Sequence, residues 1–264
     1  MSEEAIKSPQ NAKLKSLRGL RAGKEREFTA LEGRHLLEDA LAAGAKVHWV
    51  LVREGEDLED PLLQQAALVG AEIAECDGKL LHDASRLDTP PDYIAWVDRP
   101  RADWREALAA STAGDWWLVA AGVQDPGNLG ALARVAAGFG AAGLLCLKGG
   151  VSPWHPRALR GASGTTFRLP VFEGVDSTEF LAFATEQEVE LWATASDGED
   201  LDVATSGVKR EQPIAILLGE EGRGLDPWLF AACTRKVGIP LAREVESLNV
   251  ATAAAVFGWA LREK

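Results

Sequence analysis

The chain has 264 residues, 47% of them hydrophobic, and its 40 Asp and Glu outnumber its 28 Lys and Arg to give a net charge of −12. These proportions are typical of a globular protein, and no apolar run reaches the roughly 18 residues that a membrane span needs. Three distant cysteines and four histidines without zinc-ligand spacing exclude a disulfide framework and a Cys/His zinc site. With a polar opening, MSEEAIK, that is no secretory signal, we expect a cytoplasmic protein without a metal.

The first 26 residues are basic although the whole chain is acidic. Seven Lys and Arg residues stand against three Glu residues there, a local charge of +4. Such a segment can bind phosphate groups even in an acidic protein, whereas a solvated helix face is the more common meaning of a charged run. The candidate nucleic-acid contacts in this segment are Lys13, Lys15, Arg18 and Arg21.

Strand and helix patterns alternate over the next seventy residues, which predicts a small α/β domain. The segment FTALEGRHLLEDALAAG has leucines at helical spacing and a final glycine, so we expect a helix over 28–44. The remaining predicted elements are a strand at 47–52, a helix at 60–70, and strands at 71–76 and 92–97. We expect this domain to span 1–105 and a linker with Pro and charged residues to cover 106–115.

Short, continuous apolar runs dominate the region 116–264, as expected for strands covered by helices on both faces of a parallel sheet. The predicted strands are 116–123, 143–147, 189–194, 213–219 and 236–241. Helices are predicted at 128–139, 176–187 and 227–233, and from about 249. The fold class is therefore α/β with a mainly parallel sheet.

Polar or glycine-rich segments follow three of these strands, where ligands bind in open parallel sheets. In the first, QDPGNLGALARVAAGFG, Asn128 stands where it could cap a helix, and Arg134 lies within an otherwise apolar helix. An arginine there either extends to solvent or faces a ligand or an interface.

The second segment, LLGEEGRGLDPW, contains three glycines, although a plain strand-to-helix turn needs only one. It matches neither the dinucleotide-binding fingerprint nor a P-loop, and its acidic residues favour a neutral or cationic cofactor. In the third segment, GIPLAREVESLNVATAAA, Ser247 and Asn249 precede the final apolar helix, and either could cap it.

In order and spacing, DPGNLGALARVA, LLGEEGRGL and IPLAREVESLNVATAAA resemble the three motifs of the SpoU/TrmH family of RNA ribose 2′-O-methyltransferases, within the SPOUT superfamily. The intervening PRALRGASGTTFRLPV is also similar to that family, and the resemblance covers roughly residues 116–262. More weakly, SPQNAKLKSLRGLR and LEGRHLLEDAL resemble the small RNA-binding α/β domain that many members carry in front.

The resemblance implies a C-terminal trefoil knot, a homodimer built around it, and S-adenosylmethionine as cofactor. The positions that match the family's cofactor contacts are Gly219, Ile239 and Leu248, with Leu241, Gly222 and Thr194 as neighbours. A cationic sulfonium agrees with the acidic, glycine-rich character of the second segment. A knot contradicts the general rule that chains do not thread loops, so only the resemblance implies it.

The implied reaction is methyl transfer to a ribose 2′-oxygen, with ribosomal RNA of the 23S type favoured over transfer RNA by the two-domain layout. The implied catalytic cluster is Asn128, Arg134, Glu221, Ser247 and Asn249. Because a guanidinium stays protonated, we expect Arg134 to bind a phosphate and the developing oxyanion instead of acting as the base. Candidate phosphate contacts between the motifs are Arg157, Arg160 and Arg168.

Two alternatives come from other classes of function. A knotted RNA-binding protein without catalysis would have no need of both Asn128 and Arg134. A relative that methylates a base would not be expected to carry the Asn-x-Gly-x-x-x-Arg arrangement of the first motif.

Overall fold

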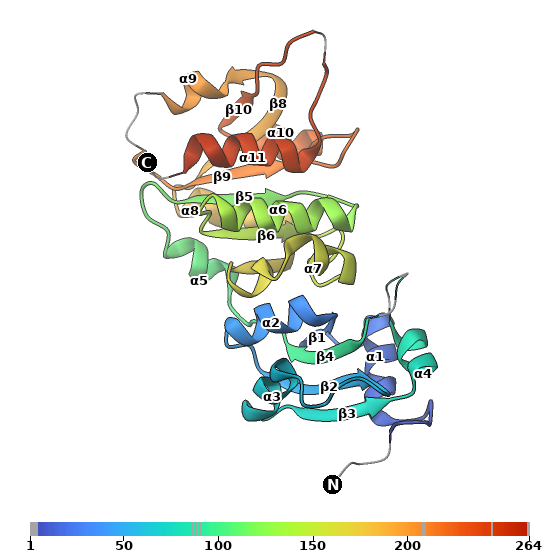
Figure 1. The fold of residues 1–264 in the computed structure, drawn as a ribbon. Coiled ribbons are helices and arrows are strands. Elements are labelled where there is room, and N and C mark those ends of the chain that lie inside the picture. The colour runs from blue at the N-terminus through green and yellow to red at the C-terminus, as the bar shows by residue number, and fades with distance from the viewer. Residues whose placement is uncertain are drawn as a thin grey trace. The chain divides into compact units, whose positions relative to one another are not determined.

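A computed structural model describes residues 5–85, 87, 89, 91–206, 210–243 and 245–262, except for the side chain of Arg21. The chain divides into two compact units, Met1–Arg101 and Ala102–Lys264 (Figure 1). We describe each unit by itself. Among the described residues, no helix has the length and apolar character to cross a membrane.

The first unit is a four-stranded sheet with helices. In chain order its elements are α1 (Ala12–Arg21), β1 (Phe28–Glu32), α2 (Arg34–Ala42), β2 (Val47–Arg53), α3 (Pro61–Leu68), β3 (Glu72–Cys76), α4 (Gly78–Ala84) and β4 (Tyr93–Asp98). The strand order is β1-β4-β2-β3, in which only β2 and β3 are parallel. Leu14, Leu17 and Leu20 of α1 pack on the sheet against Leu51 and Ile94.

The helix predicted over 28–44 is wrong in its first part, because Phe28–Glu32 forms β1 and pairs antiparallel with β4. Ala30 and Leu31 are both buried, so this strand shows no alternation and cannot be told from a helix by periodicity. The two elements meet at Gly33, whose φ of 107° is a conformation that favours glycine. The helix α4 was not predicted, although Asp77 caps it by accepting from two backbone amides.

The second unit is built on a six-stranded sheet in which every strand pair is parallel. Its order is β10-β8-β9-β5-β6-β7. The elements are α5 (Trp104–Ala109), β5 (Trp116–Ala120), α6 (Pro126–Gly138), β6 (Gly143–Leu147), α7 (Pro156–Ala162), the 3₁₀ turn η1 (Thr165–Phe167), β7 (Val171–Val175), α8 (Ser177–Glu186), β8 (Glu190–Asp200), α9 (Leu201–Thr205), β9 (Ile214–Leu218), α10 (Pro227–Ala232), β10 (Arg235–Gly238) and α11 (Val250–Leu261).

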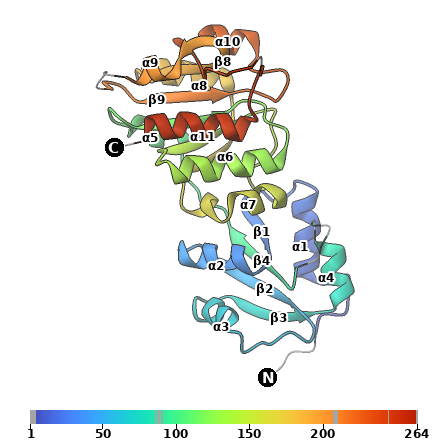
Figure 2. The same ribbon diagram turned by 45° about the horizontal axis from the view of Figure 1, so that its top comes forward.

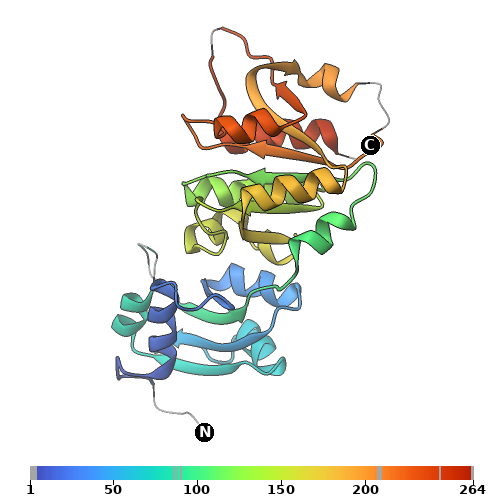
Figure 3. The same cartoon turned by 180° about the vertical axis from the view of Figure 1, so that it is seen from behind.

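Helices cover both faces of this sheet, as predicted. Trp116 and Leu118 of β5 point to the face packed by α6, α9 and α11, where Figure 2 shows α6 and α11 side by side. Trp117 and Val119 point to the opposite face, packed by α5, α8 and α10 and seen from behind in Figure 3. Residues on both faces of β5 are therefore buried, which explains the continuous apolar run in its sequence.

The five strands predicted in this region are confirmed, although β8 runs six residues beyond its predicted end and β5 and β10 each end three residues early. Three elements between the motifs were not predicted, namely α7, β7 and α9. The helix α5 begins at Trp104, within the range expected for the first domain, and continues into the segment 106–115 expected to be a linker. It lies within the second unit, which begins at Ala102.

Candidate active site

Three side chains from three distant segments form one polar network at the carboxyl end of the sheet. Asn128 lies on α6 after β5, Glu221 in the turn after β9, and Asn249 before α11. The Nδ2 of Asn128 donates to Oε1 of Glu221 at 2.6 Å, and the Nδ2 of Asn249 donates to the same oxygen at 2.9 Å. Asn249 also donates to Oδ1 of Asn128 at 3.1 Å, which closes the triangle. Glu221 and Asn249 are exposed and Asn128 is half-buried, so this network reaches solvent at the edge of the sheet.

The turn that carries Glu221 depends on glycines. The amide of Glu220 donates to the carbonyl of Gly224 at 3.1 Å, and the amide of Gly224 donates back at 2.8 Å. A Cβ on Gly219 would lie 2.1 Å from the carbonyl carbon of Gly224, which no side chain can tolerate. Gly222 and Gly224 both have positive φ. The close crossing of the backbone therefore holds Glu221 at the tip of the turn.

The cap expected for the first of the two helices is wrong, and the cap of the second is one of the two residues expected. Asp125, and not Asn128, caps α6, because its Oδ1 accepts from the amide of Asn128 at 2.7 Å. The cap of α11 is Asn249, whose Oδ1 accepts from the amide of Ala251 at 2.9 Å. Asn249 thus caps with its oxygen and joins the network with its nitrogen. Ser247 is exposed, and the described hydrogen bonds leave it outside this network.

Two cavities adjoin the turn that carries Glu221. The smaller has a volume of about 410 Å³. The larger has a volume of about 940 Å³, and we call it the glycine-lined cavity. The larger cavity is lined by Glu221, Ser247 and Asn249. It is also lined by all six positions expected to contact the cofactor, which are Thr194, Gly219, Gly222, Ile239, Leu241 and Leu248.

The glycine-lined cavity suits a cation with an apolar body. Among its described lining residues are four carboxylates, from Asp200, Glu220, Glu221 and Glu246, against one cation, Arg223. That guanidinium is largely exposed and lies 3.9 Å from Glu220, so the carboxylates outnumber the cations in the lining. Leu218, Val237 and Phe257, all buried, add apolar surface.

Two further glycines of this cavity were not singled out in the sequence. A Cβ on Gly238 would meet the carbonyl oxygen of Ala195 at 2.6 Å, and one on Gly198 would meet the carbonyl carbon of Lys236 at 2.7 Å. Both residues line the cavity, so backbone atoms form much of its wall. Their position at the ends of strands was the only available signal.

Arg134 does not join the network within this chain. It is exposed on α6, and the described residues offer it no hydrogen bond or ion pair. It follows Asn128 by six residues, which places it about 9 Å farther along the helix and about 120° around it. The structure therefore brings together Asn128, Glu221 and Asn249, but leaves Arg134 on another face of α6.

The expected RNA contacts differ in their exposure and in their bonding partners. On α1, Lys13 forms an ion pair with Glu72 at 2.6 Å, and Lys15 is exposed. The guanidinium of Arg18 donates to the carbonyls of Leu14 and Pro9, and the side chain of Arg21 lies outside the described residues. In the second unit, the exposed candidates are Arg157 and Arg160 on α7, and Arg168 beyond η1.

Two protein-family models match this chain, one in each unit. Residues 115–259 match the model of the SpoU rRNA Methylase family, and residues 11–95 match the MRM3-like substrate binding domain. An uncharacterized tRNA/rRNA methyltransferase of Synechocystis is 30% identical, covering 98% of this chain and 94% of the relative. The 23S rRNA (guanosine(2553)-2′-O)-methyltransferase RlmP of Bacillus subtilis is 29% identical, covering 97% and 98%.

Solved structures give the same result for the fold. A crystal structure of an RNA 2′-O ribose methyltransferase superposes with a TM-score of 0.74 at 29% identity, covering 96% of both chains. An rRNA methyltransferase from Sinorhizobium meliloti with bound AdoMet superposes with a TM-score of 0.82 at 23% identity, covering 98% and 97%. At that lower identity the likeness concerns the fold alone.

Proposed function

The chain belongs to the SpoU rRNA methylase family, and from this membership and the geometry of its site we propose that it methylates a ribose 2′-hydroxyl of ribosomal RNA. The observation that carries the proposal is the network of Asn128, Glu221 and Asn249 at the edge of an acidic, glycine-lined cavity. The cofactor in this proposal is S-adenosylmethionine, and the reaction is placed in the cytoplasm with its substrate.

The lining of the cavity supports this cofactor. Thr194, Gly219, Gly222, Ile239, Leu241 and Leu248 would hold it, and the surrounding carboxylates complement a positive sulfur. S-adenosylmethionine supplies an electrophilic methyl group when bound. The chain's own contribution is to position the ribose, and orientation of two reactants can lower a barrier by roughly 7–11 kcal/mol.

The polar side chains divide this work. Glu221 accepts hydrogen bonds from both asparagines and fixes the orientation of their amides. Asn128 and Asn249 therefore present their donors and acceptors to the ribose in a defined arrangement. Arg134 binds the flanking phosphate and stabilises the developing oxyanion, because its guanidinium is permanently protonated and cannot act as the base. A phosphate oxygen or water takes the proton, and Ser247 contacts the ribose from the edge of the cavity.

A second copy of the chain completes this proposal. Trp259 of α11 is 59% exposed and packs edge-on against Phe139 of α6, with ring centroids 6.4 Å apart. Such an apolar helix pair favours burial against a partner, and Arg134 lies on the exposed side of the same α6. A homodimer on this face would bring Arg134 of each protomer towards the other. The trefoil knot remains part of the proposal, with the last helix, α11, threaded through a loop.

The first unit is proposed as the RNA-binding domain, on the match of residues 11–95 and on the basic helix α1. Lys15 is exposed and is a candidate contact. Arg157, Arg160 and Arg168 would add phosphate contacts near the methylation site. Because such contacts release counterions, RNA affinity should fall steeply as salt rises.

The test is transfer of labelled methyl from S-adenosylmethionine to ribosomal and transfer RNA from a strain that lacks this protein. We expect 2′-O-methylribose in ribosomal RNA, and its loss in Arg134→Ala. Arg134→Lys should also be severely impaired, because an ammonium cannot reproduce the planar fork of the guanidinium. Label in transfer RNA alone would overturn the substrate assignment. Absence of transfer together with absence of cofactor binding would favour a non-catalytic RNA-binding protein.

A further inference from the structure

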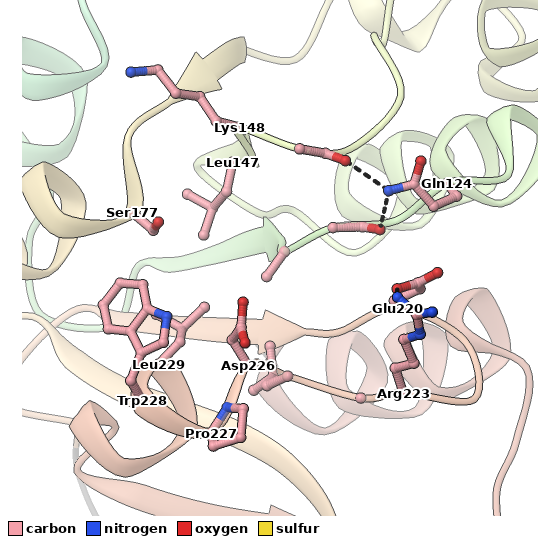
Figure 4. Close-up of a pocket in the computed structure, with 15 residues that line it drawn as sticks. Gln124, Leu147, Lys148, Ser177, Glu220, Arg223, Asp226, Pro227, Trp228 and Leu229 are labelled. Atoms are coloured by element: carbon pink, nitrogen blue, oxygen red, sulfur yellow. Dashed lines mark hydrogen bonds and ion pairs between the residues drawn. The ribbon is translucent and has the colours of Figure 1, made fainter.

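The smaller cavity, which we call the second pocket, lies beyond the carboxyl ends of β5, β6 and β9 (Figure 4). Its volume of about 410 Å³ falls within the usual range for small-ligand sites, roughly 300–1,000 Å³. It shares Glu220, Arg223 and Gly224 with the glycine-lined cavity. Glu220 thus lines the second pocket, while the next residue, Glu221, belongs to the catalytic network.

An exposed aromatic ring forms one wall of the second pocket. Trp228 on α10 is 47% exposed, although its neighbour Leu229 is buried in the core and fixes the helix in place. Figure 4 shows both residues, together with Asp226, across the pocket from Gln124 and Leu147. A large indole on a fixed element offers a flat surface on which a base can stack.

The polar groups of the second pocket leave hydrogen-bond acceptors free. Gln124 donates through Nε2 to the carbonyls of Gly122 at 3.0 Å and Gly149 at 2.6 Å, which leaves its Oε1 as an acceptor. The carboxylate of Asp226 accepts no hydrogen bond from α10, and among the described residues it has no other partner. Its oxygens point into the pocket in Figure 4. The ligand should therefore present adjacent N–H donors.

Cations stand at the rim of the second pocket. The ammonium of Lys148 lies 3.2 Å from Asp176 and keeps further N–H groups for a ligand. The side chain of Arg223 is 85% exposed, and its contact with Glu220 is a loose one. The ring of Trp228, the two carboxylate oxygens of Asp226 and the cations at the rim together match the base and phosphate of a nucleotide.

We propose that the second pocket binds an unpaired guanine of the RNA, at or directly beside the methylated nucleotide. Guanine presents neighbouring N1–H and N2–H groups, which a carboxylate such as Asp226 accepts side by side, while Trp228 stacks on the ring. Adenine lacks the paired donors, and the pyrimidines stack over a smaller area. This assignment rests on the proposed function for the kind of substrate, and it adds which base is read and where.

The test measures binding of fluorescein-labelled pentaribonucleotides to the full chain by anisotropy, without methyl transfer. The probes are 5′-UUGUU-3′, 5′-UUAUU-3′ and 5′-UUUUU-3′. We expect the guanine probe to bind about tenfold more tightly than the uridine probe, as one bidentate contact allows. Equal binding of the three probes, or binding of none, overturns the proposal.

Variants assign the preference to this pocket. Trp228→Ala and Asp226→Asn should each abolish the guanine preference, whereas Trp228→Phe should keep most of it because a phenyl ring still stacks. Asp202→Asn, which removes an exposed carboxylate of α9, is the matched control and should change nothing. Retention of the guanine preference in Asp226→Asn contradicts the assignment.

The binding assay separates this inference from the proposed function. A guanine preference without methyl transfer to any RNA leaves the pocket assigned and refutes the function. Methyl transfer by a protein whose Asp226→Asn variant has unchanged KM and kcat supports the function and refutes the pocket. Calorimetry with S-adenosylmethionine should give the same affinity for wild type and Asp226→Asn, which shows that the glycine-lined cavity is intact.

Discussion

Replacement of Asn249 by Asp separates the two functions of this side chain. Aspartate caps helices as well as asparagine does, so the bond to the amide of Ala251 is retained. The donor to Oε1 of Glu221, at 2.9 Å, is replaced by a second carboxylate oxygen. The change therefore breaks the network without uncapping α11.

The magnitude follows from two contributions. Loss of the two exposed hydrogen bonds that Nδ2 of Asn249 donates, to Glu221 and to Asn128, costs about 1 kcal/mol in all. Two unit charges about 4 Å apart in water repel by about 1 kcal/mol. Together they predict a loss of about 2 kcal/mol, which lowers the melting temperature of a unit of this size by roughly 4–8 °C. Methyl transfer should fall at least about tenfold, because the same free energy no longer orders the ribose site.

A second substitution, at Glu221, restores the hydrogen bond with donor and acceptor exchanged. In the double variant Glu221→Gln, Asn249→Asp, the new glutamine amide can donate to the new carboxylate. The amide of Asn128 can turn about its last torsion and exchange donor for acceptor. The double variant should therefore be more stable than Asn249→Asp alone, a positive interaction in a double-mutant cycle.

Thermal unfolding monitored by circular dichroism gives the stability, and labelled methyl transfer gives the activity. Asn249→Ala is the reference that loses both roles, and it should cost about 1 kcal/mol more than loss of the network bond alone, because the cap is also removed. Wild-type stability in Asn249→Asp, or a double variant no more stable than the worse single one, would refute the reasoning.

Three further changes test other parts of the structure. Gly219→Ala places a Cβ 2.1 Å from the carbonyl carbon of Gly224, so the turn must shift, and calorimetry should show at least about tenfold weaker binding of S-adenosylmethionine. The hydrogen bond from Arg34 holds the pKa of Asp60 below its usual value, so this carboxylate stabilises the fold above its unfolded-state pKa, and the contribution is lost as pH falls through the depressed one. Asp60→Asn should accordingly melt below wild type at pH 7, with the difference vanishing in acid; a constant difference would argue against this. Burial raises the pKa of Cys76 to about 11, so native protein should resist alkylation by iodoacetamide at pH 8, while protein in urea reacts, as read by mass spectrometry.

Much of the second unit was predictable because its signals are local. A strand buried on both faces must be apolar along its whole length, as in β5, β6 and β9. The helices α6, α8, α10 and α11 also lie at the positions that periodicity indicated. The first unit was less predictable, because the same lack of alternation in β1 resembles a helix until its pairing with β4 is known.

The sequence by itself determined which segments carry polar and glycine-rich loops, and their order along the chain. Only the tertiary structure decided that Asn128, Glu221 and Asn249 meet, because residues separated by as many as 121 positions become neighbours only when parallel strands align their carboxyl ends. The separation of Arg134 from Asn128 follows from helix geometry alone, since a helix sends residues six apart to different faces. The second pocket was invisible in the sequence, because Gln124 and Asp226 line one space only once β5 and β9 lie side by side.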